Sequence, residues 1–312
     1  MTKADFAATL AARAPALRVQ QNAILAPLTT FKVGGPADWL VDVTDAAALR
    51  AALDAARAAG LAAVVLGGGS NVLISDAGIR GVVIRVRGGE ARYLGSDLVR
   101  ADAGLTINGL VRWTISRGLS GLEGWAGTPG TVGGAVYGNA HFKVRLIGSL
   151  IDSVELVTKV GDVVRVEAAA MEFGYDRSRV QRTNETVLSA DFRVGQGDPT
   201  VLRTVARESL AYRKRTQPLE SSSAGCIFQN PDPVHDRVPA GIPASAGALV
   251  DRAGLKGTRE GGARVSPTHG NFIINEGTAT AADIRRLIER CRVAVRDTFG
   301  VELRDEIVYL GF

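Results

Sequence analysis

Residues 64–75 read Val-Val-Leu-Gly-Gly-Gly-Ser-Asn-Val-Leu-Ile-Ser, and this stretch decides the fold. The apolar run over 61–66 predicts a buried strand that leads directly into three glycines at 67–69. Glycines at the end of a strand allow positive φ angles and let a ligand touch the main chain. Successive N–H groups in such a turn form a concave site suited to phosphate or pyrophosphate. An ordinary Gly-rich turn between two strands is the alternative, and this stretch alone does not separate the two.

A second glycine-rich segment favours the ligand-binding interpretation. Residues 121–139 read Gly-Leu-Glu-Gly-Trp-Ala-Gly-Thr-Pro-Gly-Thr-Val-Gly-Gly-Ala-Val-Tyr-Gly-Asn. We expect a long loop there, with free N–H groups and room for a flat ligand. Neither segment carries the Lys-Ser/Thr pair of a Walker loop, and the first lacks the spacing and the following helix of a Rossmann fingerprint. Together they predict a nucleotide-type cofactor held by a pair of non-Rossmann loops.

The bulk properties of the chain limit its class. Its 312 residues are enough for two or three domains, and 46% hydrophobic with 22% charged residues is ordinary for a globular protein. The net charge of +5 is modest and the arginines are scattered, so nucleic-acid binding is not indicated. A basic balance does fit an enzyme whose ligands are phosphorylated anions.

Cysteine, histidine and hydropathy patterns predict a cytoplasmic protein. Cys226 and Cys291 are far apart and lack C-x-x-C spacing, which argues against a disulfide framework or zinc site and favours a reducing compartment. The three histidines form no cluster in the sequence, so we expect no metal. The N-terminal segment lacks the pattern of a signal peptide, and no apolar run approaches the ~18 residues of a membrane span.

Hydrophobic periodicity predicts a mixed α+β fold. Helices are expected over 2–13, 45–59, 106–117, 199–215, 245–253 and 280–298. Strands are expected over 36–43, 61–66, 81–87, 98–102, 186–194, 271–274 and 305–310, with a hairpin formed by 150–158 and 162–167. Thr44 or Asp45 should cap the second helix and Thr106 the third, while Gly60 and Gly118 end them.

Eight motifs in a fixed order give the chain a resemblance to a known family. They are 30–37 (Thr-Phe-Lys-Val-Gly-Gly-Pro-Ala), 66–73 (Leu-Gly-Gly-Gly-Ser-Asn-Val-Leu), 127–135 (Gly-Thr-Pro-Gly-Thr-Val-Gly-Gly-Ala), 223–231 (Ser-Ala-Gly-Cys-Ile-Phe-Gln-Asn-Pro), 253–257 (Ala-Gly-Leu-Lys-Gly), 262–266 (Gly-Ala-Arg-Val-Ser), 269–275 (His-Gly-Asn-Phe-Ile-Ile-Asn) and 301–307 (Val-Glu-Leu-Arg-Asp-Glu-Ile). One such motif would be weak, whereas eight in order make chance a poor explanation. Over nearly its whole length the chain resembles the UDP-N-acetylenolpyruvoylglucosamine reductases, the MurB flavoenzymes of peptidoglycan precursor synthesis.

The resemblance implies a fold and a cofactor. It implies the FAD-binding fold of the vanillyl-alcohol oxidase/PCMH type, made of two α+β subdomains, followed by a C-terminal α+β domain that covers the substrate. The composition shift after residue 215 places a boundary near 197–200. We therefore predict FAD-binding subdomains over 1–80 and 81–198, a substrate-binding domain over 199–300, and a terminal strand with a catalytic Glu over 301–312. FAD is expected to bind non-covalently, because no His stands close to the glycines at 67–69 in the sequence.

The reaction that the resemblance implies has two halves. NADPH gives a hydride to the flavin, and the reduced flavin gives a hydride to the enolpyruvyl methylene carbon of UDP-N-acetylglucosamine enolpyruvate. A protein acid then protonates the adjacent carbon, which yields UDP-N-acetylmuramate. Because the intermediate resembles an enolate, the site needs cationic and hydrogen-bonding groups where negative charge develops.

Two residues match the acids of the family. Cys226 stands where the family most often has a proton-donating Ser, and a thiol, with a pKa of about 8.5, is a far stronger acid than a hydroxyl. The alternative is a small Cys that only packs, which is our expectation for Cys291 on its predicted helix. Glu306 matches the C-terminal Glu that assists at the carboxylate end of the substrate, although an acid at the start of a terminal strand is often only solvated.

The catalytic Arg departs from the family pattern, which is Phe-x-Tyr-Arg-x-Ser. Residues 173–178 read Phe-Gly-Tyr-Asp-Arg-Ser, so Asp176 holds the expected Arg position. Arg177 or Arg179 can take over the role, or either can be a surface residue. We predict Arg177.

The substrate contacts implied by the resemblance are Lys214, Asn230 and Lys256. Lys214 has the spacing before Cys226 of a substrate-binding Lys, although Lys is also common in the last turn of a helix. Asn230 resembles the family Asn at the UDP group, and Lys256 can pair with the diphosphate or lie in an exposed turn. The interval between Ser178 and the strand at 186 is too short for the extra Tyr loop of some members, so the chain resembles the type that lacks it.

The flavin contacts are expected in both glycine segments. At the pyrophosphate we predict Gly67, Gly68, Gly69, Ser70, Asn71 and Val72. Along the ribityl and isoalloxazine side we predict Thr128, Pro129, Gly130, Thr131, Gly133 and Ala135. Two other functions stay open at this level: an oxidase of the same flavin fold that acts on a sugar or alcohol, and a nucleotide-sugar-binding protein without catalysis.

Overall fold

The computed structural model describes residues 4–142 and 144–312. The chain divides into two compact units, each made of three segments. Unit 1 comprises Met1–Ala23, Asp38–Gly68 and Gly81–Ala211, and unit 2 comprises Ile24–Ala37, Gly69–Arg80 and Tyr212–Phe312. The division at residues 80, 198 and 300 stays a prediction. Within the described ranges, no helix combines the length and the apolar character needed to cross a bilayer.

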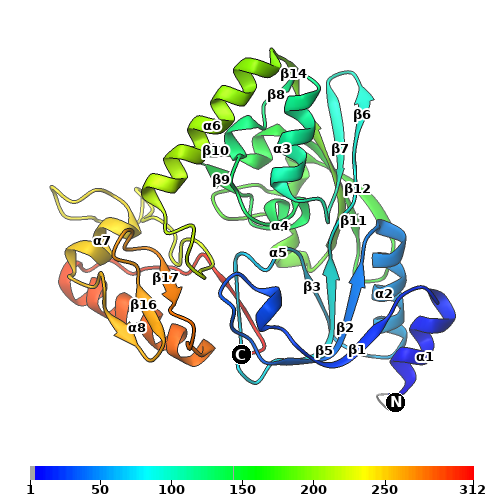
Figure 1. Cartoon of the computed structure of the whole chain (residues 1–312), viewed down its shortest axis with the longest axis horizontal. Helices are drawn as coiled ribbons and strands as arrows, with labels where there is room; N and C mark the ends of the chain where they lie inside the picture. The colour runs from blue at the N-terminus through cyan, green and yellow to red at the C-terminus, as the bar shows by residue number, and fades with distance from the viewer. Residues whose placement is uncertain (1–3, 143) are drawn as a thin grey trace. The chain divides into compact units, whose positions relative to one another are not determined.

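The first sheet of unit 1 carries a helical layer on one face. The strands β1 (Val19–Ile24), β2 (Pro36–Val43), β5 (Ile79–Val86) and β3 (Ala63–Leu66) lie in the order β1-β2-β5-β3. The helices α1 (Ala4–Arg13) and α2 (Ala46–Ala58) pack against it through a core that includes Phe6, Trp39, Leu49 and Ile84 (Figure 1). Of the two predicted caps, Thr44 and Asp45, it is Asp45 that caps α2, by accepting a hydrogen bond from Ala48 N–H.

Strand β3 corrects the expectation of a buried strand over 61–66. It is an edge strand of this sheet, paired in parallel with β5. Ala63 and Val65 are exposed, and Leu66 alone of its four residues is buried. A strand at the edge of a sheet has a neighbour on one side only, so an apolar sequence there does not ensure burial.

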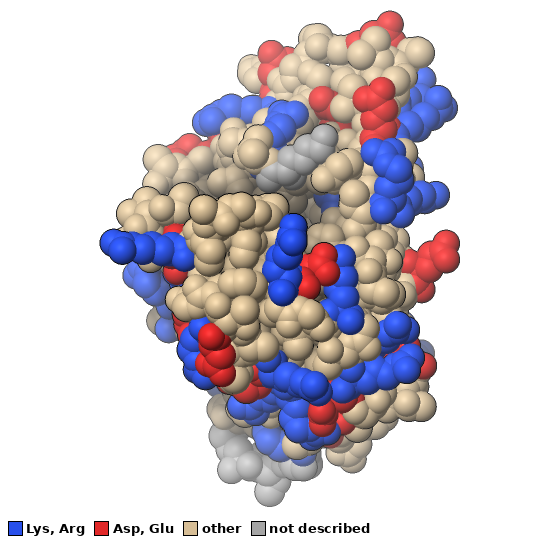
Figure 2. Space-filling model, turned by 90° about the vertical axis from the view of Figure 1, so that its left-hand side faces the viewer, with Lys and Arg blue, Asp and Glu red and all other residues tan. Residues whose placement is uncertain are grey.

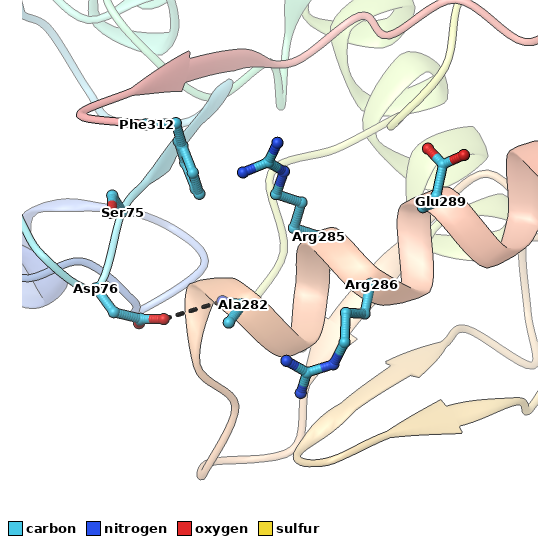
Figure 3. A pocket seen from close by; sticks show the side chains of 7 residues that line it. All are labelled: Ser75, Asp76, Ala282, Arg285, Arg286, Glu289 and Phe312. Atoms are coloured by element: carbon cyan, nitrogen blue, oxygen red, sulfur yellow. Dashed lines mark hydrogen bonds between the residues drawn. The ribbon is translucent and has the colours of Figure 1, made fainter.

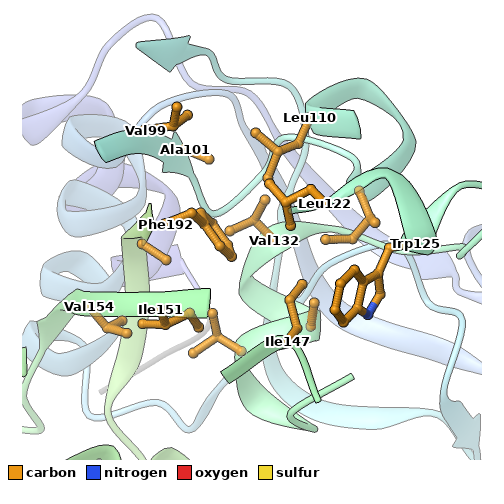
Figure 4. Packing of buried hydrophobic residues seen from close by; sticks show 14 of the residues in the cluster. Val99, Ala101, Leu110, Leu122, Trp125, Val132, Ile147, Ile151, Val154 and Phe192 are labelled. Atoms are coloured by element: carbon orange, nitrogen blue, oxygen red, sulfur yellow. The ribbon is translucent and has the colours of Figure 1, made fainter. Parts of the chain in front are cut away.

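The second sheet of unit 1 is antiparallel and holds the larger core. Its strands are β12 (Val163–Glu167), β11 (Ile151–Val157), β13 (Thr186–Arg193), β7 (Leu98–Asp102) and β6 (Ala91–Gly95), in that order. Figure 4 shows Leu110 of α3 (Ile107–Ser116) and Val132 of α4 (Val132–Tyr137) packed with Ile151 and Phe192 of this sheet. The predicted hairpin is β11 and β12, so that expectation is confirmed. Thr106 caps α3, as predicted.

The segment 121–139 is not the continuous loop that its glycines suggested. It holds the short helix η2 (Glu123–Trp125) and the helix α4, which Thr131 caps by accepting a hydrogen bond from Gly134 N–H. Within α4, the N–H of Gly133 donates to Ala103 O and that of Ala135 to Thr131 O. These N–H groups therefore serve the protein and are not open to a ligand.

Shorter elements lie between these strands and helices along the chain. They are η1 (Ala26–Leu28), β8 (Leu119–Ser120), which pairs with β14 (Gly195–Gln196), β9 (His141–Phe142), which pairs with β10 (Arg145–Leu146), η3 (Ile147–Leu150), η4 (Ala168–Met171) and α5 (Val180–Thr183). The long helix α6 (Pro199–Thr216) begins in unit 1 and ends in unit 2.

Unit 2 packs two helices against a small antiparallel sheet. The sheet is β15 (Arg259–Glu260), β16 (Ala263–Val265) and β17 (Ile273–Asn275), and the helices are α7 (Ala246–Arg252) and α8 (Ala281–Phe299) (Figure 1). A capping box of Thr280 and Asp283 starts α8. Cys291 lies buried in this core, where burial raises the pKa of its thiol to about 12. The expectation that Cys291 packs is therefore confirmed.

The terminal strand is shorter than the predicted 305–310. It is β18 (Val308–Leu310), which pairs in parallel with β4 (Val72–Ile74). The residues before it pair with a different segment, because Asp305 forms a β-bridge with Phe228 and Glu306 N–H donates to Ile227 O.

Charges of both signs are mixed on the surface. On the face drawn in Figure 2, Lys and Arg side chains lie among Asp and Glu side chains. Ion pairs in unit 2 give examples of such neighbours: Arg259 with Glu276 at 2.8 Å, and Arg304 with Asp236 at 2.7 Å.

Candidate active site

The two glycine segments meet in unit 1. A Cβ atom on Gly67 would lie 2.4 Å from Thr131 Oγ1, and one on Gly68 would lie 2.7 Å from Gly130 Cα. Only glycine permits main chains to approach this closely. Because Gly68 is exposed, the joined segments present main chain to a ligand. A surface of this kind fits the phosphate groups of a dinucleotide such as FAD.

Asn108 holds the second glycine segment in place, and the sequence pattern gave no reason to select it. From α3, its Oδ1 accepts a hydrogen bond from Gly127 N–H at 2.7 Å, and its Nδ2 donates to Thr128 O at 3.1 Å. An amide that pairs with the main chain on both sides of a turn fixes the course of that turn. Its position two residues after the Thr106 cap was the available signal.

The other predicted flavin residues of this segment differ in accessibility. Pro129 is exposed and Gly130 and Gly133 are half-buried, whereas Thr128 and Thr131 are buried. Ala135 is buried in the core of unit 1, so it can offer a ligand little of its side chain. The contacts of these residues with FAD stay predictions.

The rest of the first glycine motif belongs to unit 2. Thr30 N–H donates to Gly69 O at 3.0 Å. Asn71 Nδ2 donates to Glu306 O at 3.1 Å, and Asn71 O accepts from Val308 N–H at 3.0 Å. Asn71 and the strand of Val72 therefore anchor the C-terminal segment, a role that adds to the predicted cofactor contact.

Cys226 and Glu306 are brought together in unit 2. The segment 226–229 runs between two others: Cys226 forms a β-bridge with Phe272, and Glu306 N–H donates to Ile227 O at 2.8 Å. Both residues are half-buried. Two segments that are about 80 positions apart in the sequence, one carrying the thiol and the other the carboxyl group, are thus paired through their main chains.

Asn271 holds the segment 226–229 in place through hydrogen bonds. Its side chain is 3% exposed; Oδ1 accepts from Phe228 N–H at 2.9 Å, and Nδ2 donates to Phe228 O at 2.7 Å. Its own carbonyl accepts from Ile227 N–H at 2.9 Å. Asn271 belongs to the motif at 269–275, but the sequence pattern indicated no role for it. An amide directly before the apolar run Phe-Ile-Ile was the available signal.

Arg213 is the buried cation beside Cys226. It is 6% exposed, burial lowers the pKa of its guanidinium, and the charge on the Cys226 side chain opposes that shift. The predicted Lys214 is exposed in the last turn of α6. Arg213 follows the buried Ser209 by four residues on one helix face, which is the signal that could have identified it.

In the loop over 173–179, where the family pattern expects a catalytic Arg, the charged side chains have different partners. Arg179 forms a two-point ion pair with Glu185, at 2.8 and 2.9 Å, which raises the pKa of Arg179 and lowers that of Glu185. Arg177 is exposed and its guanidinium lies over Gly174. Asp176 lies against His141, with Oδ1 and Nδ1 3.1 Å apart. Arg179 is thus occupied in the fold, and the role of Arg177 stays a prediction.

The remaining predicted substrate residues have partners within unit 2. Asn230 Oδ1 accepts from Ala246 N–H at 3.1 Å, at the start of α7. Lys256 Nζ lies 2.7 Å from Asp251 Oδ2. Burial lowers the pKa of His269, and the positive charge of Lys256 lowers it further. The contacts of Asn230 and Lys256 with the substrate stay predictions.

A separate pocket of about 320 Å³ lies at the start of α8. Figure 3 shows Asp76 turned toward the first turn of this helix. Its carboxylate accepts hydrogen bonds from the N–H groups of Ala281 and Ala282, at 2.8 and 2.9 Å. Arg286, on its rim, pairs with Glu260 at 2.9 Å, and no predicted site residue lines the pocket. Its polar groups therefore serve to cap and brace α8.

Comparison with known proteins identifies the family. Residues 217–310 match the model for the UDP-N-acetylenolpyruvoylglucosamine reductase C-terminal domain, and residues 37–167 match a FAD binding domain. The UDP-N-acetylenolpyruvoylglucosamine reductase of Heliobacterium modesticaldum is 39% identical over 284 residues, which cover 91% of this chain and 88% of that protein. That of Desulfosudis oleivorans is 39% identical over 312 aligned positions, covering 94% and 95%. The crystal structure of MurB from Thermus caldophilus is 33% identical, with a TM-score of 0.78 over 94% of this chain and 99% of that one.

These matches bear directly on the predicted fold and cofactor. The expected α+β fold, a FAD-binding part followed by a C-terminal domain, is confirmed, and so is FAD as the cofactor. The likeness extends over both units and nearly the full length of the relatives. The chain therefore belongs to the UDP-N-acetylenolpyruvoylglucosamine reductase (MurB) family of FAD-dependent oxidoreductases.

Proposed function

We propose that this protein reduces UDP-N-acetylglucosamine enolpyruvate to UDP-N-acetylmuramate with NADPH as the hydride donor. The observation that carries this proposal is the backbone pairing between the segment of Cys226 and the segment of Glu306, in a chain of this family. FAD, when bound, supplies the redox chemistry by accepting a hydride from NADPH and passing it to the enolpyruvyl methylene carbon. The protein supplies the binding surfaces, the proton and the charges.

The glycine segments bind the cofactor in this proposal. Main-chain groups of Gly67 to Val72 hold the pyrophosphate, and residues from Thr128 to Ala135 lie along the rest of FAD. The close approach of Gly68 to Gly130 supports this, because it leaves the main chain of both segments clear of side chains.

Cys226 is the proton donor in this proposal. Its thiol proton goes to the carbon next to the methylene carbon, and the thiolate that remains takes a proton from water before the next turnover. The buried guanidinium of Arg213 supports this role, because a cation beside the sulfur stabilises the negative charge left on it.

Glu306, Arg177 and the substrate residues orient the enolpyruvyl nucleotide. Glu306 assists at the carboxylate end of the substrate, and Arg177 offsets the negative charge that develops there. Lys214 binds the substrate in this proposal, Asn230 contacts the UDP part, and Lys256 pairs with the diphosphate.

An anaerobic absorbance titration of the purified protein tests the proposal. NADPH should bleach the flavin band near ~450 nm, and UDP-N-acetylglucosamine enolpyruvate should restore it. A band that NADPH bleaches but this substrate does not restore would refute the assigned substrate. Fast reaction of the reduced flavin with oxygen, with no need for NADPH, would support an oxidase instead. A protein that takes up no FAD would leave only a binding role.

A further inference from the structure

In unit 1, hydrogen bonds join the loop over 173–181 to the segment over 137–141, at the end of α4. Ser178 Oγ donates to Tyr137 O at 2.6 Å, and Gln181 Nε2 donates to the same oxygen at 3.0 Å. Asn139, itself buried, donates from Nδ2 to Gly174 O at 2.7 Å. The loop over 173–181 and the segment over 137–141 therefore form one braced structure, and groups that face each other across it keep a fixed geometry.

Asp176 and His141 face each other across this structure. The Asp176 side chain is only 8% exposed, and its Oδ1 lies 3.1 Å from His141 Nδ1. Its Oδ2 is buried and has no hydrogen-bond partner among the described residues. The loop holds Asp176 at φ +51°, in the left-handed region, and Gln181 Nε2 donates to Asp176 O at 2.9 Å. A buried carboxylate with one unpartnered oxygen is unfavourable for stability, which points to a use other than holding the fold together.

The pair fixes the chemistry of the imidazole. With Nδ1–H donating to the carboxylate, Nε2 is the ring nitrogen left to a ligand. His141 keeps 22% of its side chain exposed, so the ring is not closed off from solvent. The ring also packs against Tyr175, with the ring centres 5.1 Å apart, which restricts its rotation. Held in this way, the imidazolium form presents one directed, charged N–H donor.

The two arginines of this loop are less suited than His141 to stabilise negative charge on a substrate. Arg179 is already paired at two points with Glu185. Arg177 is exposed, so water screens its charge more strongly. The proposed reaction builds negative charge on the enolpyruvyl group, which a preorganised and partly buried donor stabilises best.

We propose that His141 is a further catalytic residue of the proposed reaction. As an imidazolium it donates a hydrogen bond from Nε2 to the carboxylate of the enolpyruvyl substrate, in addition to the part assigned to Arg177. Asp176 is a positioning residue that orients the ring and balances its charge. This inference rests on the proposed function.

The test measures the two half-reactions separately by anaerobic stopped-flow absorbance. The variants are H141Q and D176N, and the matched control is H235Q, because His235 is exposed in unit 2. We expect substrate-driven flavin reoxidation to slow about 100-fold in H141Q, the effect of losing one preorganised donor, and roughly 10-fold in D176N. Flavin reduction by NADPH, flavin content and melting temperature should match those of the unaltered enzyme, and H235Q should change nothing.

The outcomes separate this inference from the proposed function. Reoxidation of H141Q and D176N within twofold of the unaltered enzyme would overturn the role of His141 and leave the proposed function standing. Equal losses in both half-reactions, with a lower melting temperature, would reduce the pair to a structural contact and also overturn it. If the unaltered enzyme is not reoxidised by the substrate, the proposed function fails, and this inference fails with it.

Discussion

Replacement of Asn271 by Ala should strongly destabilise unit 2. The side chain makes two hydrogen bonds to one buried residue, Phe228, at 2.9 and 2.7 Å. Removal of the amide leaves a buried N–H and a buried C=O unpaired, and each such group costs about 1–3 kcal/mol. We therefore expect the free energy of unfolding to fall by about 3 kcal/mol, the lower part of that combined range.

Urea titration followed by far-UV circular dichroism measures this loss, because α7 and α8 contribute to the helical signal together with the helices of unit 1. All three tryptophans, at 39, 113 and 125, lie in unit 1, so their fluorescence serves as an internal comparison. Gln20→Ala is the matched control, since it removes an exposed amide. A loss in Asn271→Ala below about 1 kcal/mol, comparable to a surface substitution, would show that water or a backbone shift replaces the amide and would refute the reasoning.

Three further predictions follow from the same structure. Gly68→Ala places a Cβ atom 2.7 Å from Gly130 Cα, so FAD affinity in a fluorescence titration should fall at least tenfold, whereas Gly138→Ala, with its nearest neighbour at 3.8 Å, should bind FAD normally. Cys226→Ala should leave flavin reduction by NADPH intact and slow reoxidation by roughly 100-fold or more, with Cys226→Ser losing less; equal rates in all three proteins would exclude Cys226 as the proton donor. Glu185→Gln should lose about 2 kcal/mol of stability at pH 7. Because Arg179 holds the pKa of Glu185 below its ordinary value, that stabilisation is present above the unfolded-state pKa and disappears as the pH falls through the folded-state pKa. Urea midpoints that keep the same difference between the two proteins at every pH would contradict this.

Much of the fold could be predicted from local sequence alone. Thr106 caps α3 and Asp45 caps α2 as expected, because capping depends on a few neighbouring residues. The hairpin of β11 and β12 follows from two alternating runs and a short turn. The expectations for β3 and for the loop over 121–139 were wrong, because edge position and the helix α4 depend on pairing with distant segments.

For the candidate site, too, some features could be predicted from local sequence and others depended on distant segments. By itself, the sequence determined the family, the two glycine segments that we assign to FAD, and the presence of a thiol and a carboxyl group in their motifs. Only the tertiary structure decided that the segments of Cys226 and Glu306 pair through their main chains, that Arg213 and not Lys214 is buried beside the thiol, and that Asp176 lies against His141. The physical reason is range: caps and turns are set by residues within a few positions, whereas burial and hydrogen-bond partners depend on which distant segments the packed core brings together.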